Sequence, residues 1–131
     1  MKEKIIEIIK EELEKRENIL FAYIFGSFVN SEKYNDIDIA IYVSDFNREK
    51  VLDMEFELER ILEDKLNISF DVRIINEAPL GFVYNVLKNK IIVLDRDSLL
   101  RSDFESLIFR KYFDYQHLID EYLREIKNAS I

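Results

Sequence analysis

Apolar and polar positions alternate along the chain with the two periods that distinguish helices from strands. Residues 3–17 repeat apolar side chains every three to four positions between Glu and Lys, which predicts an amphipathic helix. Residues 19–25 are apolar at almost every position, which indicates a strand buried on both faces. The same reading predicts, in order, a strand that opens at Asp36, a helix over 48–66, a strand over 69–75, a short helix over 80–87 and a short edge strand over 91–94.

The strand that opens at Asp36 alternates without interruption. Its polar-side positions are Asp36, Asp38, Ala40 and Tyr42, and its other side carries Ile37, Ile39, Ile41 and Val43. The two carboxylates therefore share one face, with their Cα atoms about 7 Å apart by the rise of a strand. Neighbouring carboxylates repel each other and fit an apolar core poorly, so a cation between them is expected. Ligands that are all oxygen favour a hard ion, and Mg²⁺ is the natural candidate.

The strand over 69–75 places a third carboxylate, Asp71, among apolar neighbours. One interpretation is structural: Asp71 pairs with Arg73 or faces solvent on an edge strand. The other places this strand beside the Asp36–Asp38 strand, so that Asp71 joins the same face. Three carboxylates with Mg²⁺ form a two-metal site that can clamp the attacking and leaving oxygens of a phosphoryl or nucleotidyl transfer.

A Gly26-Ser27 turn follows the first predicted strand. Glycine permits a sharp turn and the close approach of a ligand. Ser27 offers a hydroxyl and a backbone N–H where a helix or turn begins, a position that suits phosphate. Such turns are also common where no ligand binds, so the pair gains meaning only from the acidic residues that follow.

Residues 98–127 predict a long helix with one broad, aromatic-rich apolar stripe, made of Leu100, Phe104, Leu107, Ile108, Tyr112, Tyr115, Ile119, Tyr122 and Ile126. Its first half is expected to join the core, and its end to form an interface with a partner. Arg110 and His117 lie about two turns apart on this helix. An Arg–His pair could serve RNA cleavage, but an exposed pair on an amphipathic helix is the simpler interpretation.

Composition narrows the function. A chain of 131 residues with 48% hydrophobic content suits one domain over residues 1–131, with a core over about 3–95 and a C-terminal helical extension over about 98–128. The absence of cysteine excludes disulfides and thiolate metal sites and fits a reducing cytoplasm. No signal peptide or membrane-spanning run is present. A net charge of −8 argues against direct binding of nucleic acid through phosphate contacts.

The chain resembles the DNA polymerase β nucleotidyltransferase superfamily, and its minimal (MNT) type in particular. The resemblance rests on Gly26-Ser27, followed after eight residues by Asp36-x-Asp38 and then by Asp71 in a later strand. The resemblance covers roughly residues 3–95. It implies an α+β fold, with a small mixed sheet flanked by helices and a C-terminal helical extension. The chain departs from the family pattern in a shorter Gly-Ser to Asp-x-Asp spacer, and in Asn35 where serine usually precedes the first Asp.

The resemblance also implies roles for these residues. Asp36 and Asp38 would hold two Mg²⁺ ions, and Asp71 would help to bind the catalytic ion and to activate an acceptor hydroxyl. Gly26 and Ser27 would hold the β- and γ-phosphates of a nucleoside triphosphate, with ATP as the donor. The hydroxyl would attack the α-phosphate, and pyrophosphate would leave.

Stand-alone members of this type are often antitoxins that silence a HEPN-type RNase toxin by transferring AMP from ATP to one of its tyrosines. The resemblance thus predicts a Mg²⁺-dependent protein adenylyltransferase in the cytoplasm, alone or in a homo- or hetero-oligomer. Two alternatives stay open: an antitoxin that acts by direct binding with a vestigial site, and a transferase for a small-molecule or RNA acceptor.

Overall fold

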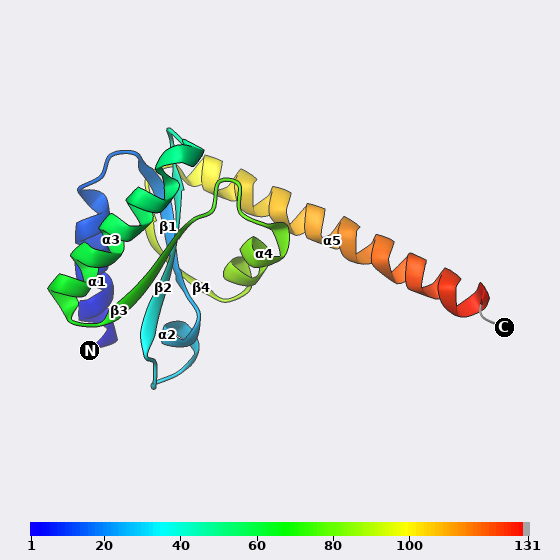
Figure 1. Cartoon of the computed structure of the whole chain (residues 1–131), viewed down its shortest axis with the longest axis horizontal. Coiled ribbons are helices and arrows are strands. Elements are labelled where there is room, and N and C mark those ends of the chain that lie inside the picture. The colour runs from blue at the N-terminus through cyan, green and yellow to red at the C-terminus, as the bar shows by residue number, and fades with distance from the viewer. Residues whose placement is uncertain (130–131) are drawn as a thin grey trace.

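The computed structural model describes residues 1–129 as a four-stranded sheet with helices on both faces (Figure 1). The elements in chain order are α1 (Lys2–Glu14), β1 (Ile19–Phe25), α2 (Ser27–Asn30), β2 (Asp36–Val43), the 3₁₀ turn η1 (Arg48–Lys50), α3 (Val51–Leu66), β3 (Ser69–Ile74), α4 (Leu80–Lys88), β4 (Lys90–Asp95) and α5 (Ser98–Ala129). The predicted α+β class, with a small mixed sheet and a long C-terminal helix, is confirmed.

The strand order is β3-β2-β1-β4, so β3 and β4 are the edges. β1 runs antiparallel to both β2 and β4, whereas β2 and β3 are parallel. Parallel neighbours need a crossover connection, and α3 provides it. The crossover brings the strand with Asp71 beside the strand with Asp36 and Asp38, as one of the two interpretations of Asp71 required.

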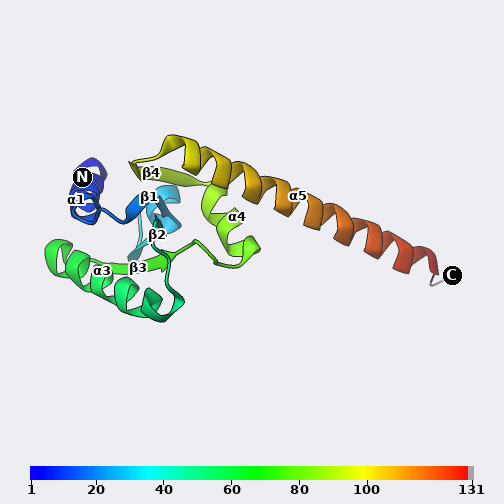
Figure 2. The ribbon, with the colours of Figure 1, turned by 90° about the horizontal axis from the view of Figure 1, so that it is seen from above.

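The two faces of the sheet are covered by different helices (Figure 2). α1 and α3 pack on the face that carries the isoleucines of β2, with Leu13 and Leu62 fully buried there. α4 and the start of α5 pack on the other face, where Ala40 and Tyr42 belong to a second apolar cluster. The predicted alternation of β2 is therefore confirmed. We call the second face, which also carries Asp36, Asp38 and Asp71, the site face.

The outer edge of β3 is closed by glutamates of α3. The carboxylates of Glu63, Glu59 and Glu55 accept hydrogen bonds from the backbone N–H groups of Phe70, Val72 and Ile74, at 3.0, 2.8 and 2.9 Å. The glutamates are spaced four residues apart on α3, and the amides are spaced two apart on β3, so the two periods match along the edge. These three bonds, which we call the glutamate ladder, hold β3 and therefore Asp71 in place.

Two element boundaries differ from the prediction by more than two residues. α1 ends at Glu14 instead of residue 17. The Arg96 guanidinium donates hydrogen bonds to the backbone carbonyl oxygens of Glu14, Arg16 and Ile19, the last two at 2.6 and 2.8 Å. These bonds hold the chain after Glu14 in a non-helical conformation. The predicted helix over 48–66 begins as a 3₁₀ turn and becomes α-helical at Val51.

α5 is continuous over its described length and lies partly off the body (Figure 1). Its start packs on α4 and the sheet, and Ile108 is its buried residue. Beyond Tyr112, which still stacks on Tyr84 of α4, the helix projects away from the sheet, on the side opposite α1 and α3 (Figure 1). None of the helices in residues 1–129 combines the length and apolar character needed to cross a bilayer.

Candidate active site

Gly26 makes the turn that joins β1 to α2. Its φ of 80° and ψ of −156° lie in a region that side chains other than glycine rarely adopt. A Cβ atom at this position would overlap the Asp38 Oδ2 atom. Position 26 therefore requires glycine for two reasons: the backbone angle and the closeness of the Asp38 carboxylate. Ser27 is the first residue of the single turn of helix that follows, as the sequence predicted.

The strand registers bring the acidic residues together. Asp38 is paired with Phe25 on β1 and with Asp71 on β3, so it lies between the Gly26 turn and the third carboxylate. Asp36 is at the first position of β2 and is exposed, whereas Asp38 is half-buried. These pairings bring Gly26, Asp38 and Asp71 close together, as the second interpretation of Asp71 required.

The charges of this cluster are not balanced. Burial raises the pKa of the Asp38 carboxyl, and the nearby Asp36 and Asp71 raise it further, while Arg73 acts in the opposite sense. An ionised Asp38 is therefore less stable here than in water. A cation placed among these carboxylates would relieve both effects.

Asp71 satisfies both interpretations at once. It lies beside Asp38 in register, and its Oδ1 also accepts a hydrogen bond from Nε of Arg73 at 3.0 Å. The pair is partly exposed, with 43% of the Asp71 side chain and 56% of the Arg73 side chain accessible to solvent. Within residues 1–129, no group of three or more carboxylate, histidine or cysteine side chains is arranged to hold a metal ion as the side chains lie. A metal site formed by Asp36, Asp38 and Asp71 stays a prediction. The bond from Arg73 uses only the Oδ1 atom of Asp71 and leaves its Oδ2 atom for a metal ion.

An open hollow of about 1040 Å³ adjoins the cluster. Its lining includes Ser27 and Asp36 from the predicted site, the loop residues Lys33 and Tyr34, and Asn67 from the end of α3. No sequence pattern pointed to Asn67 or to the neighbouring start of β3 as site residues, because only the parallel crossover brings that turn next to β2. The hollow offers a cation, Lys33, and a hydroxyl, Ser27, next to Asp36.

The family model for the polymerase beta nucleotidyltransferases matches residues 5–99. The chain belongs to this nucleotidyltransferase family. The matched residues contain every predicted site residue and all four strands. The family predicted from Gly26-Ser27, Asp36-x-Asp38 and Asp71 is therefore confirmed.

Solved structures of similar fold cover almost the whole nucleotidyltransferase chain. One, described as tri-AMPylated Shewanella oneidensis HEPN toxin in complex with MNT antitoxin, is 20% identical with a TM-score of 0.61, over 96% of this chain and 99% of that chain. A toxin–antitoxin structure with AMP-PNP is 20% identical with a TM-score of 0.65, over 100% of both chains. A MntA–HepT toxin–antitoxin structure is 20% identical with a TM-score of 0.62, also over 100% of both chains. At such identity these likenesses show the fold. No curated protein matches the sequence.

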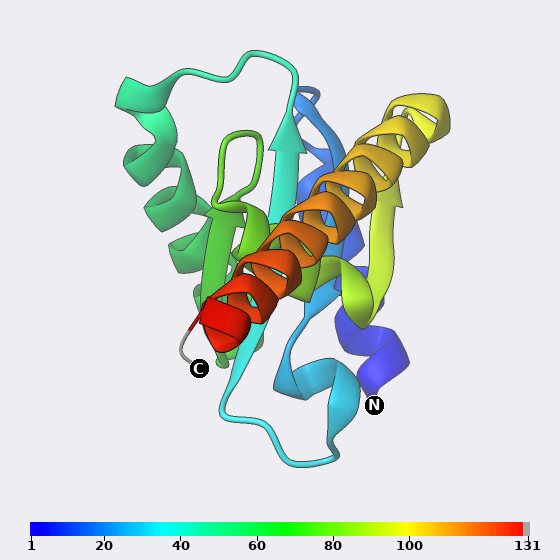
Figure 3. The same cartoon turned by 90° about the vertical axis from the view of Figure 1, so that its right-hand side faces the viewer.

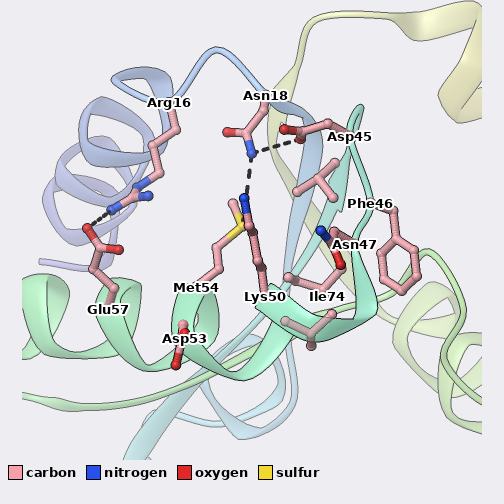
Figure 4. Close-up of a pocket in the computed structure, with 12 residues that line it drawn as sticks. Arg16, Asn18, Asp45, Phe46, Asn47, Lys50, Asp53, Met54, Glu57 and Ile74 are labelled. Atoms are coloured by element: carbon pink, nitrogen blue, oxygen red, sulfur yellow. Dashed lines mark hydrogen bonds and ion pairs between the residues drawn. The ribbon is translucent and has the colours of Figure 1, made fainter.

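A second pocket of the nucleotidyltransferase lies at the opposite end of β2 from Asp36 (Figure 4). It measures about 330 Å³ and lies between the loop after α1 and the start of α3. Several of its polar groups already bind each other: Arg16 is paired with Glu57 at 2.8 Å, and Asn18 donates to Asp45 at 3.2 Å. None of the predicted site residues lines this pocket.

Arg110 and His117 are both exposed on α5. The His117 ring stacks on the Phe113 ring, with 6.1 Å between centroids and 7° between planes. This matches the simpler interpretation, an exposed pair on an amphipathic helix.

Proposed function

We propose that this nucleotidyltransferase uses Mg²⁺ and ATP to transfer AMP to a tyrosine hydroxyl of a HEPN-type toxin, and so acts as its antitoxin. One observation carries the chemistry: Asp38 lies in register with Asp71 and directly against the Gly26 turn. This places the acidic cluster next to the backbone where a triphosphate would lie in the proposed complex.

The donor set suits Mg²⁺, because Asp36, Asp38 and Asp71 offer oxygen ligands alone and their charges repel. The bound ions would supply charge neutralisation for the triphosphate. In the proposal, Asp36 and Asp38 hold both ions, Asp71 joins the catalytic one, and Gly26 and Ser27 bind the β- and γ-phosphates.

In the proposed transfer one bond forms, one bond breaks, and a side chain of this protein accepts the released proton. The tyrosine oxygen forms a bond to the α-phosphorus while the bond to the β-phosphate oxygen breaks, and pyrophosphate leaves. Asp71 accepts the proton of the hydroxyl, through the carboxylate oxygen that Arg73 does not engage. Positioning and charge neutralisation account for most of the catalysis in such a site.

The identity of the partner rests on likeness. The related structures are described as toxin–antitoxin pairs, one of them with a tri-AMPylated HEPN toxin and another with AMP-PNP. They cover 96–100% of this chain, including α5. We therefore extend the partner, the nucleotide and the modification to this protein as parts of the proposal.

The test incubates the purified chain with Mg²⁺, radiolabelled ATP and the product of the neighbouring gene, which the proposal expects to be a HEPN-type protein. Label on that protein is expected, and the double variant Asp36→Asn, Asp38→Asn should lower the rate about 100-fold or more. The matched control is Asp53→Asn, Asp64→Asn, which removes the same charge at two exposed positions of α3. Unchanged transfer by the Asp36/Asp38 variant would show that these residues are not the ligands.

An antitoxin that acts by contact alone is the second candidate. The Asp71–Arg73 ion pair favours it, because a vestigial site has no need to keep Asp71 available. Under this alternative the Asp36→Asn, Asp38→Asn variant still protects cells from the toxin, whereas under the first proposal protection is lost with transfer.

A further inference from the structure

α5 carries one continuous apolar stripe with spacings of four and three residues, made of Ile108, Tyr112, Tyr115, Ile119, Tyr122 and Ile126. This spacing is the heptad pattern of helices that pack against other helices. The stripe keeps the same pattern from the body of the molecule to the end of the projecting part.

The inner part of the stripe is already packed. Ile108 is 8% exposed within the cluster on the site face. The Tyr112 ring stacks on Tyr84 of α4, with 3.7 Å between centroids and 5° between planes. The stripe is therefore a packing surface wherever α5 lies on the body of the molecule, as it does at Ile108 and Tyr112.

The outer part of the stripe, which we call the outer stripe, consists of Tyr115, Ile119, Tyr122 and Ile126. Tyr115, Tyr122 and Ile126 are 53%, 60% and 47% exposed. The outer stripe lies within residues 113–129, a length of roughly 25 Å at the rise of an α-helix. A contiguous apolar surface on a projecting helix is typical of a protein–protein contact.

The width of this surface indicates the shape of its partner. Leu118 and Leu123 flank the outer stripe on its two sides and are 63% and 56% exposed. A single partner helix covers only a narrow seam, whereas a surface widened on both sides fits a groove between two helices. A second copy of this chain would offer just one projecting helix, and its inner stripe is taken by α4.

The charge of α5 indicates which residues should line the rim of the partner's groove. Between residues 113 and 129, α5 carries four acids, Asp114, Asp120, Glu121 and Glu125, against two bases, Arg124 and Lys127. A partner with basic residues along the rim of an apolar groove would complement both features.

The direction of α5 links this surface to the acidic cluster. α5 leaves the body on the site face, the same face that carries Asp38 and Asp71. In Figure 3 it runs obliquely in front of the sheet, and its C-terminal end lies in front of β3. A protein bound along the outer stripe therefore lies on the side of the sheet where transfer is proposed.

We propose that the outer stripe docks the acceptor protein, by inserting into an apolar, basic-rimmed groove between two of its helices, and so presents the acceptor hydroxyl to the site face. The role of the docked protein as acceptor rests on the proposed function. The docking itself is a property of α5 and is tested by binding.

The test uses calorimetry to measure the affinity of the chain for the product of the neighbouring gene, which the proposed function expects to be a HEPN-type protein. The variant Leu118→Asp, Tyr122→Asp places two charges on the docking side, and its Kd should rise about tenfold or more. The control Phe113→Asp, Asn128→Asp adds the same charge at exposed positions on the opposite side of the helix, and should bind as the wild type does. Circular dichroism verifies that both variants keep α5.

Three results would overturn the docking role: equal Kd values for the two variants, no complex with the wild-type chain, or a wild-type dimer in light scattering that Leu118→Asp, Tyr122→Asp converts to a monomer. The Asp36→Asn, Asp38→Asn variant separates this inference from the proposed function. It should bind with an unchanged Kd and fail in transfer. Retained transfer by that variant would contradict the proposed metal ligands and leave the docking surface supported.

Discussion

Gly26 and Asp38 are the two residues whose positions depend most directly on each other. The backbone angle of Gly26 and the closeness of Asp38 Oδ2 both exclude a side chain at position 26. Since the turn directs Ser27 toward the hollow next to Asp36, a change at Gly26 affects both the fold and the site.

Gly26→Ala is expected to lower the free energy of unfolding by about 1–3 kcal/mol, because alanine is strained at this backbone angle and displaces Asp38. The other glycine supplies the control: a Cβ at Gly81 in α4 meets nothing within 4 Å, so Gly81→Ala should raise stability by up to about 1 kcal/mol. Urea denaturation measures both. Similar effects of the two changes would contradict the close approach at Gly26.

Asp38→Asn is expected to stabilise the metal-free protein by up to about 1 kcal/mol, even as it abolishes transfer. Burial and two neighbouring carboxylates raise the pKa of Asp38, so its charged form disfavours the fold and an uncharged amide of similar size does not. Thermal unfolding in EDTA and then in Mg²⁺ checks this.

Added Mg²⁺ should raise the Tm of the wild type and have little effect on Asp38→Asn, because a ligand stabilises only the state that binds it. Asp53→Asn, an exposed change on α3, is the control and should respond to Mg²⁺ as the wild type does. A wild type that ignores Mg²⁺ would contradict the metal site.

At this scale the sequence predicted the shared face of Asp36 and Asp38, because a strand alternates strictly. It left the partner of Asp71 open, since both Arg73 and Asp38 are within reach of that position. The structure shows Asp71 next to both. No local pattern could have decided this, because it depends on the pairing of two strands that are separated by a helix.

Among the elements, β3 depends most on a neighbour that is not a strand. It is an edge strand, and unpaired edge amides invite pairing with other chains. The glutamate ladder of α3 closes this edge. Glu55 is half-buried, and this partial burial raises the pKa of its carboxyl because it disfavours the charged form.

Glu59→Ala is expected to lower the free energy of unfolding by about 1 kcal/mol, since it leaves the Val72 N–H without its partner. The control is Asp64→Ala, an exposed position of the same helix. Replacing Glu55, Glu59 and Glu63 together should add self-association that grows with concentration, visible in light scattering. A triple variant that stays monomeric would show that the ladder does not guard the edge.

The order of strands and helices was predictable, because each apolar run has a clear period and ends at a polar residue. Asn67, for example, ends α3 in the left-handed conformation with a φ of 56°. The ladder was not predictable, since glutamates spaced four apart resemble any solvated helix face. The early end of α1 was not predicted, because Arg96, which binds the backbone after the helix, is 80 residues away from Arg16 in the sequence.

At the scale of the molecule, the chain divides into a body and a projecting helix. The last α5 ring that stacks on the body is Tyr112, against Tyr84. The predicted division into a core over about residues 3–95 and a C-terminal extension over about 98–128 stays a prediction.

Removal of residues 114–131 tests the division. The shortened chain should keep its Tm within about 2 °C, because its apolar clusters stay intact. It should also lose the complex with the HEPN-type protein. A large fall in Tm would mean that the extension belongs to the core.

All five residues assigned to the site lie in the first 71 positions, whereas the cover of the site face begins only after Pro79. A chain emerging from the ribosome therefore completes β1 to β3 while Phe21, Tyr23 and Tyr42 still await α4 and α5. During that interval the nascent protein presents an aromatic surface, which makes it a substrate for chaperones and vulnerable to aggregation. The pace of synthesis over roughly the last third of the gene thus bears directly on how much functional protein a cell obtains.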